Sequence, residues 1–149
     1  MDQTSVTHRY QFAAQHRLHS ERFSEEENRR VFGKCNNPNG HGHNYTLFVT
    51  VRGPVDPQTG RAADLDALDR LVQETVVARF DHRDLNRDPA FAERTTTGEN
   101  LVLFVWDLLA AKLPTGQLGK VGLIETRDNY FEYSGEAAVN AVASGSPVW

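Results

Sequence analysis

The chain has 149 residues, which is about the length of one ordinary domain and is enough to bury a hydrophobic core. Its net charge of −4 argues against general nucleic-acid binding, which requires a basic face. No apolar run approaches the roughly 20 residues that span a bilayer, and the first residues lack the pattern of a signal peptide. The lone cysteine, Cys35, cannot form an internal disulfide, so the default expectation is a cytoplasmic protein.

Two strands separated by a long polar loop are predicted first. Apolar residues and histidines alternate with polar residues over 6–16, which indicates a strand. Residues 18–40 are mostly polar, and Ser24 begins a capping box that is typical of a short helix. The segment 33–40 is dense in turn-forming residues, and a loop of this length inside a domain is usually functional. Alternation resumes over 41–51 and predicts the second strand.

Two helices and two further strands follow. A helical stripe over 64–80 predicts an amphipathic helix capped at its first residue. A second helix is expected to begin at Thr96 or Thr97, and strands are expected over 121–125 and 130–133. This order predicts an α+β fold with a largely antiparallel, four-stranded sheet. Its two open edges favour oligomerisation.

Three histidines give the sharpest chemical signal. His41 and His43 project to the same side of their strand and can converge on one ion. His16, on the other strand, can supply a third nitrogen. Three histidine ligands leave the fourth tetrahedral position open, which is the pattern of a catalytic zinc site. The alternative is that His-Gly-His is a polar turn and that His16 is an ordinary strand residue.

Cys35 and the adjacent pair Asp81 and His82 are the next candidates. Cys35 is either a fourth metal ligand, a thiolate acting as base or nucleophile, or an inert buried cysteine. Asp81 can hold His82 in one tautomer, as in catalytic triads, or can cap the chain locally beside a surface histidine. The basic residues Arg29, Arg30 and Lys34 precede the cysteine and can attract a phosphate chain.

Glu125 interrupts an apolar alternation. It lies either at a solvated strand end or in a pocket where it accepts hydrogen bonds from a ligand. A carboxylate matches the two adjacent N–H donors of a guanidine-like edge, as found in pterins and guanine. Glu99 is by default a helix-cap residue, and aromatic residues such as Tyr45 are expected in the core or an interface.

These motifs closely resemble those of the 6-pyruvoyl-tetrahydropterin synthase family, which includes 6-carboxytetrahydropterin synthase relatives. The similarity extends from about residue 10 to residue 136 and is carried by the segments 12–19, 31–45, 81–86, 97–100 and 125–126. The resemblance implies a single pterin synthase domain over 1–136, and we expect the extension 137–149 to be poorly ordered.

The implied architecture is the tunnelling fold, in which two helices pack on a four-stranded antiparallel sheet. Three such subunits close a barrel, and two barrels stack into a homo-hexamer. Active sites in this family lie between subunits, so the functional residues need not all come from one chain.

The resemblance also implies the role of each candidate residue. His16, His41 and His43 match the family's zinc ligands, Cys35 its proton-abstracting cysteine, Asp81 and His82 the relay pair, Glu125 the anchor of the pterin ring, and Glu99 and Thr97 the lining of that pocket. Gly98 departs from the family, which often has a hydroxyl residue there.

The implied activity is that of a carbon–oxygen lyase, which converts 7,8-dihydroneopterin triphosphate to 6-pyruvoyl-tetrahydropterin with loss of triphosphate. One alternative is the 6-carboxytetrahydropterin synthase reaction of queuosine biosynthesis, which starts from the same substrate. The other is a non-catalytic module that binds zinc or a pterin.

Overall fold

Two strands of 14 residues each are the longest elements of the fold. The computed structural model describes residues 2–135, and in it β1 (Gln3–His16) pairs antiparallel with β2 (His41–Pro54) along its whole length. The register places Gln3 opposite Pro54 at one end and His16 opposite His41 at the other. The alternation in the sequence therefore predicted both strands, and all three histidines lie at one end of the pair.

In the described part of the chain, the sheet has five strands in the order β3-β1-β2-β4-β5. The strands β4 (Leu118–Thr126) and β5 (Asn129–Tyr133) continue it antiparallel beyond β2. The prediction of four strands was wrong by one, because β3 (Arg83–Asp84) pairs parallel with the end of β1. A strand of two residues is too short to show any periodicity in the sequence. The sheet of this single chain is not closed, and its edges are β3 and β5.

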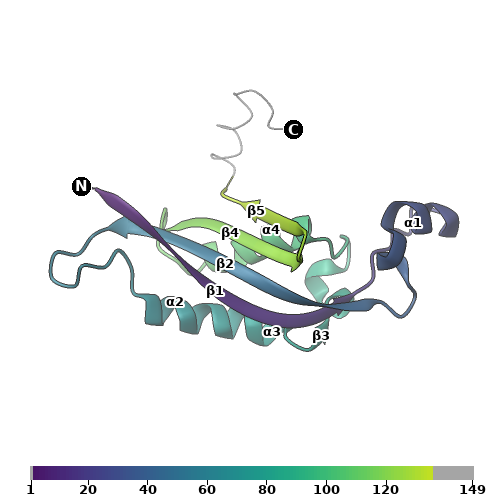
Figure 1. The fold of residues 1–149 in the computed structure, drawn as a ribbon, viewed down its shortest axis with the longest axis horizontal. Coiled ribbons are helices and arrows are strands. Elements are labelled where there is room, and N and C mark those ends of the chain that lie inside the picture. Colours follow the sequence, from purple (N-terminus) through teal and green to yellow (C-terminus); the bar gives the residue numbers. More distant parts are fainter. Residues whose placement is uncertain (1, 136–149) are drawn as a thin grey trace, which may run out of the picture.

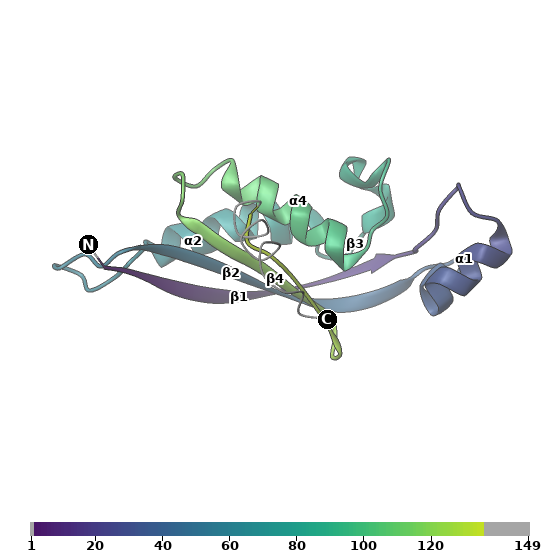
Figure 2. The same cartoon turned by 90° about the horizontal axis from the view of Figure 1, so that it is seen from above.

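The helices that follow β2 lie on one face of the sheet (Figures 1 and 2). The predicted helix over 64–80 consists of α2 (Leu65–Val72), a π-helical turn (Gln73–Val77) and α3 (Ala78–Phe80). The second helix, α4 (Gly98–Ala110), begins after Thr97, whose hydroxyl accepts a hydrogen bond from the Asn100 amide. Among residues 2–135, no helix is long and apolar enough to cross a membrane.

The short helix α1 (Glu25–Phe32) projects beyond the end of the β1–β2 pair (Figures 1 and 2). Its N-cap is Ser24, as the capping box predicted, and a 3₁₀ turn (Gly33–Asn36) follows directly and carries Cys35. The residues 137–149, for which we expected disorder, lie outside the described part of the chain.

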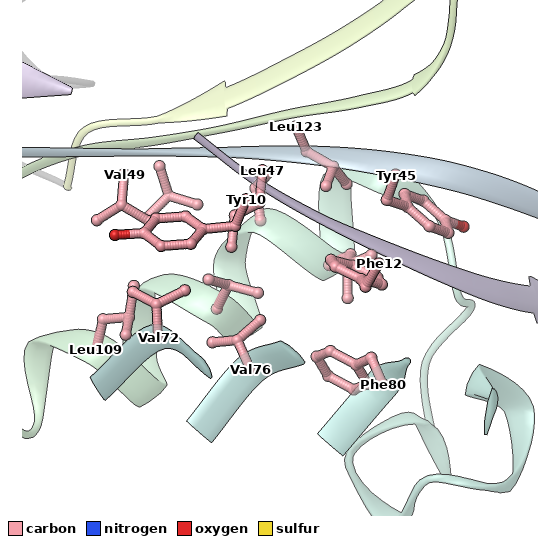
Figure 3. Packing of buried hydrophobic residues seen from close by; sticks show 14 of the residues in the cluster. Tyr10, Phe12, Tyr45, Leu47, Val49, Val72, Val76, Phe80, Leu109 and Leu123 are labelled. Carbon is pink, nitrogen blue, oxygen red and sulfur yellow. The ribbon is translucent and has the colours of Figure 1, made fainter. Parts of the chain in front are cut away.

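The hydrophobic core fills the space between the sheet and the two long helices (Figure 3). One face of the strands supplies Tyr10, Phe12, Tyr45, Leu47, Val49, Val121 and Leu123, and the helices supply Leu68, Val72, Val76, Phe80, Leu101, Val105 and Leu109. The buried polar residues His16 and Glu125 have the same parity as these core residues on β1 and β4. The candidate site is therefore a polar continuation of the core at one end of the sheet.

Candidate metal centre and active site

The three candidate histidines converge at the end of the β1–β2 pair. His16 lies opposite His41, and His43 is two residues further along the same face of β2. One nitrogen from each ring lies within 4.8 Å of the other two. The Nε2 atoms of His16 and His43 are 3.0 Å apart. The structure thus brings together the three nitrogens that the sequence suggested as ligands.

Hydrogen bonding and burial prepare these imidazoles to bind a metal. His16 is fully buried and its Nδ1 donates to the Thr96 carbonyl at 2.8 Å, which leaves the Nε2 lone pair facing the cluster. Burial lowers the pKa of His16, and it lowers the pKa of His43 to about 4 with help from the charges of the other two histidines. Both rings are therefore neutral at pH 7, the form that coordinates a metal.

His41 provides the test of whether a metal fits. Its Nε2 is buried and has no hydrogen-bond partner in the described structure. Buried polar atoms of this kind are rare unless a water or an ion satisfies them. Three imidazole ligands suit zinc, and the cluster does not include Cys35. The residues present therefore fit a zinc ion with an open coordination position.

The turn that carries Cys35 is held against the segment just after β1. The Cys35 carbonyl accepts a hydrogen bond from the Leu18 amide at 2.7 Å, and Asn36 Nδ2 donates to the Leu18 carbonyl at 2.8 Å. Gly40 closes the loop with φ of +68°, and a Cβ there would lie 2.9 Å from the His16 carbonyl oxygen. The loop is therefore positioned by contacts of Cys35, and of the residues that follow it, with the chain at and just after His16.

Glu125 enters the same site from β4. Its side chain is 8% exposed, and its Oε1 lies 3.8 Å from His43 Nε2. Burial raises its pKa, Asn129 favours the ionised form, and the charge of Glu99 raises the pKa again. Glu99 on the first turn of α4 thus lies within electrostatic reach of Glu125. Thr97, by contrast, uses its hydroxyl to cap α4.

Cys35 is within electrostatic reach of Glu125 as well. Burial, followed by the charge of Glu125, raises the pKa of the Cys35 thiol. The structure therefore associates the cysteine with the carboxylate and does not place it in the histidine cluster. Without a cation nearby, Cys35 is a thiol at neutral pH.

Asp81 and His82 lie next to β1 on the side away from β2. Asp81 Oδ1 accepts a hydrogen bond from the Ala13 amide at 2.9 Å, and Asp81 Oδ2 is 3.6 Å from His82 Nε2. The His82 side chain is 83% exposed, and its φ of 59° is unusual for a residue other than glycine. Within residues 2–135, no hydrogen bond or ion pair joins this pair to Cys35, so the contacts within one chain do not link the three residues.

Two residues at the site were not among the site residues predicted from the sequence. Thr96 orients His16 through its main-chain carbonyl, which no side-chain pattern reveals. Tyr45, expected in the core or an interface, is completely buried, and its pKa is raised by burial and by the charges of Glu125 and Cys35. Its parity with His41 and His43 was a signal that it faces the same site.

A cavity of about 750 Å³ opens beside the histidine cluster and reaches His41. Three of its lining residues, Arg17, Arg29 and Lys34, carry positive charge. None of these three forms an ion pair with another described residue. The cavity therefore combines one histidine of the candidate metal cluster with three cationic groups against one carboxylate, Glu25. This excess of positive charge suits a ligand with an anionic tail.

Together, the sheet with its helices on one face and the three converging histidines define the class: an α+β protein with a group of histidines that could hold a metal ion at one end of its sheet. Residues 5–136 match the family of 6-pyruvoyl tetrahydropterin synthase. The chain belongs to this family.

Individual relatives agree with the family match. The chain is 47% identical over 135 residues to the 6-pyruvoyl tetrahydrobiopterin synthase of Homo sapiens, a match that covers 90% of this chain and 93% of the relative. It is 41% identical over 139 residues to the enzyme of the same name from Drosophila melanogaster, covering 92% and 83%.

Solved structures extend the likeness to the fold. The structure of Caenorhabditis elegans 6-pyruvoyl tetrahydropterin synthase aligns with a TM-score of 0.84 at 39% identity, covering 91% of this chain and 98% of that one. The Plasmodium falciparum 6-pyruvoyl tetrahydropterin synthase, at 14% identity and a TM-score of 0.64, covers 89% of this chain and 98% of its own and shares the fold.

Gly98, the departure noted in the sequence, has a packing explanation. A Cβ at this position would overlap the ring of Phe131 on β5, which lies against the start of α4. We therefore expect Gly98→Ser to lower the free energy of unfolding by about 1–3 kcal/mol through overpacking. Urea unfolding measures this loss. In a Phe131→Ala background the same substitution should cost less, and an equal cost in both backgrounds would contradict the explanation.

Proposed function

We propose that this chain is a zinc-dependent 6-pyruvoyl-tetrahydropterin synthase, which converts 7,8-dihydroneopterin triphosphate to 6-pyruvoyl-tetrahydropterin and triphosphate. The observation that carries the proposal is the convergence of three imidazoles, one with an unsatisfied buried nitrogen, beside the buried Glu125. The 47% identity to the Homo sapiens enzyme supports the assignment of the reaction.

His16, His41 and His43 would hold the metal. When bound, zinc supplies Lewis-acid chemistry that acidifies hydrogens on carbon atoms next to substrate oxygens. The other parts of the mechanism depend on side chains of this chain. No nicotinamide or other external redox cofactor is required, because the reaction is an elimination followed by tautomerisation.

Glu125 anchors the pterin ring in this proposal. The 2-amino group and the neighbouring ring N–H present two parallel donors, which one carboxylate accepts together. Because Glu125 is nearly inaccessible to solvent, the two hydrogen bonds would form without competition from water. Thr97 and Glu99, at the start of α4, line the same pocket.

Cys35 is the proposed base, and Asp81 with His82 forms the relay. The Cys35 thiolate takes the proton from a side-chain carbon, and the electron pair of the broken C–H bond forms a new double bond as the neighbouring C–O bond to triphosphate breaks. His82, oriented by Asp81, carries protons for the tautomerisation that moves the reducing equivalents into the ring. The positive charges of Arg17, Arg29 and Lys34, which form no ion pair with another described residue, suit the triphosphate tail.

We further propose that the relay forms between copies of the chain in a homo-hexamer made of two trimers. The open edges β3 and β5 are available for pairing, and the exposed His82 adjoins β3. Mixing separately inactive Cys35→Ala and His82→Ala proteins under exchange conditions should then restore activity, because some interfaces combine an intact cysteine with an intact histidine. Triphosphate release measures the recovery, with each variant alone as control. No recovery despite proven subunit exchange would place the relay within one chain.

The proposed function is tested by incubating the zinc-loaded protein with 7,8-dihydroneopterin triphosphate and analysing the products by mass. Release of triphosphate with a pyruvoyl product supports the proposal. A carboxy side chain would assign the queuosine-pathway reaction instead. If the substrate stays intact while zinc and pterin bind, the chain is a non-catalytic binding module.

A further inference from the structure

Two buried side-chain polar atoms have no hydrogen-bond partner in the part of the chain that the structure describes. They are His41 Nε2 and the Tyr45 hydroxyl oxygen. A metal ion accounts for the first atom. It does not account for the second, because a neutral phenol at pH 7 keeps its proton and needs an acceptor for it. An unpaired buried donor loses its hydration without compensation, so a missing partner is informative.

The phenol ring of Tyr45 is fixed on two sides. It stacks on Phe12 with ring centres 5.0 Å apart and an interplanar angle of 17°. On another side, it meets His43 with ring centres 5.6 Å apart. The ring has no exposed surface, so it cannot rotate its hydroxyl into bulk solvent. The direction of the hydroxyl is therefore set by packing.

That direction leads away from the core. In Figure 3 the oxygens of Tyr10 and Tyr45 point to opposite ends of the hydrophobic cluster, and that of Tyr45 points toward the end where β1 finishes. The Tyr10 hydroxyl donates to Asp69 at 2.6 Å. Of the two phenols in this core, one is therefore satisfied by the protein and the other is aimed at the candidate site.

The sheet register fixes which site residues surround the Tyr45 hydroxyl. Thr46 pairs with Ile124 at the end of the β2–β4 ladder, and Tyr45 and Glu125 are the next residues along the two strands, both of them buried. His43 lies two residues before Tyr45 on the same face of β2. The phenol thus stands between the proposed anchor of the pterin ring and a proposed metal ligand.

We propose that the Tyr45 hydroxyl donates a hydrogen bond to the bound pterin. Its acceptor would be a ring nitrogen or the first side-chain oxygen, between the edge held by Glu125 and the atoms held near His43. This inference rests on the proposed function and adds a third fixed point to the substrate. A ligand held at three points along its length has one orientation, which places the reacting carbon in reach of its base.

The test compares Tyr45→Phe with Tyr10→Phe in the zinc-loaded protein. Each substitution removes one hydroxyl from the same core and keeps its ring. For Tyr45→Phe we expect binding of 7,8-dihydroneopterin, measured by calorimetry, to weaken about tenfold and kcat/KM to fall at least as much. Its urea midpoint should stay equal to that of wild type or rise, because an unsatisfied donor is removed.

Tyr10→Phe should show the opposite pattern, with a lower urea midpoint and unchanged pterin binding, because its hydroxyl serves only the fold. The inference is overturned if Tyr45→Phe binds the pterin as wild type does. It is also overturned if its urea midpoint falls as in Tyr10→Phe, since the hydroxyl would then have a structural partner. If wild type itself does not bind the pterin, the proposed function fails. The binding measurement on wild type distinguishes this result from the two outcomes that overturn the inference alone.

Discussion

Cys35→Ala is expected to reduce triphosphate release by about 10²–10⁴-fold, the usual contribution of a general base. The variant should still bind one zinc ion per chain, because the histidine cluster does not include the cysteine. Product analysis and metal content measure the two effects. Cys35→Ser is the matched control: it keeps a similar shape but replaces the thiol with a much weaker acid, so it should be nearly as inactive. Turnover at the wild-type rate in the alanine variant would remove Cys35 from the mechanism.

The pKa of Cys35 provides a second measurement for the same prediction. Burial and the Glu125 charge raise this pKa, so less thiolate is present at pH 7 and the fraction increases as the pH rises toward the pKa. A bound zinc ion adds positive charge nearby and acts in the opposite direction. We therefore expect iodoacetamide to alkylate Cys35 slowly in metal-free protein, faster at higher pH, and faster at pH 7 once zinc is bound. Equal rates with and without zinc would show that the metal does not activate this thiol.

The sequence was sufficient to predict the parts of the site that depend on strand parity. His16, His41 and His43 face one another because two long strands alternate regularly. The same alternation put Glu125 on the face of Leu123, but the sequence left open whether it was solvated or buried, and the structure shows it buried. The sequence predicted that α4 begins at Thr96 or Thr97. The hydrogen bond from the Asn100 amide identifies Thr97 as the N-cap. Features that follow a regular period in the sequence could thus be predicted from the sequence alone.

Features that depend on a single tertiary contact could not be predicted from the sequence. The strand β3 exists because residues after Phe80 return to the end of β1, where Asp81 and His82 both bond to Ala13. A pattern search over two residues cannot detect such a strand. The missing partner of the Tyr45 hydroxyl is also a property of the folded surroundings, since parity gives the direction of a side chain and says nothing of its acceptors.

Removing the metal is expected to lower the stability of the folded chain substantially. A ligand that binds only the native state stabilises it by about 4 kcal/mol when present at 1,000 times its dissociation constant. Zinc-loaded wild type should therefore unfold at a clearly higher urea concentration than the same protein after chelation, and re-addition of zinc should restore the difference. Unfolding curves that do not change with zinc would contradict a metal site at the histidine cluster.

His41→Ala separates the loss of the metal from damage to the fold. His16 donates to the Thr96 carbonyl, so its replacement would leave a buried acceptor unpaired and destabilise even metal-free protein. His41 Nε2 has no partner among residues 2–135, so without metal the alanine variant should be about as stable as metal-free wild type. It should fail to gain stability when zinc is added. His8→Ala is the matched control, because His8 lies on β1 and bonds to Asp69 outside the cluster, and its response to zinc should match that of wild type. A full zinc response in His41→Ala would show that this imidazole is not a ligand.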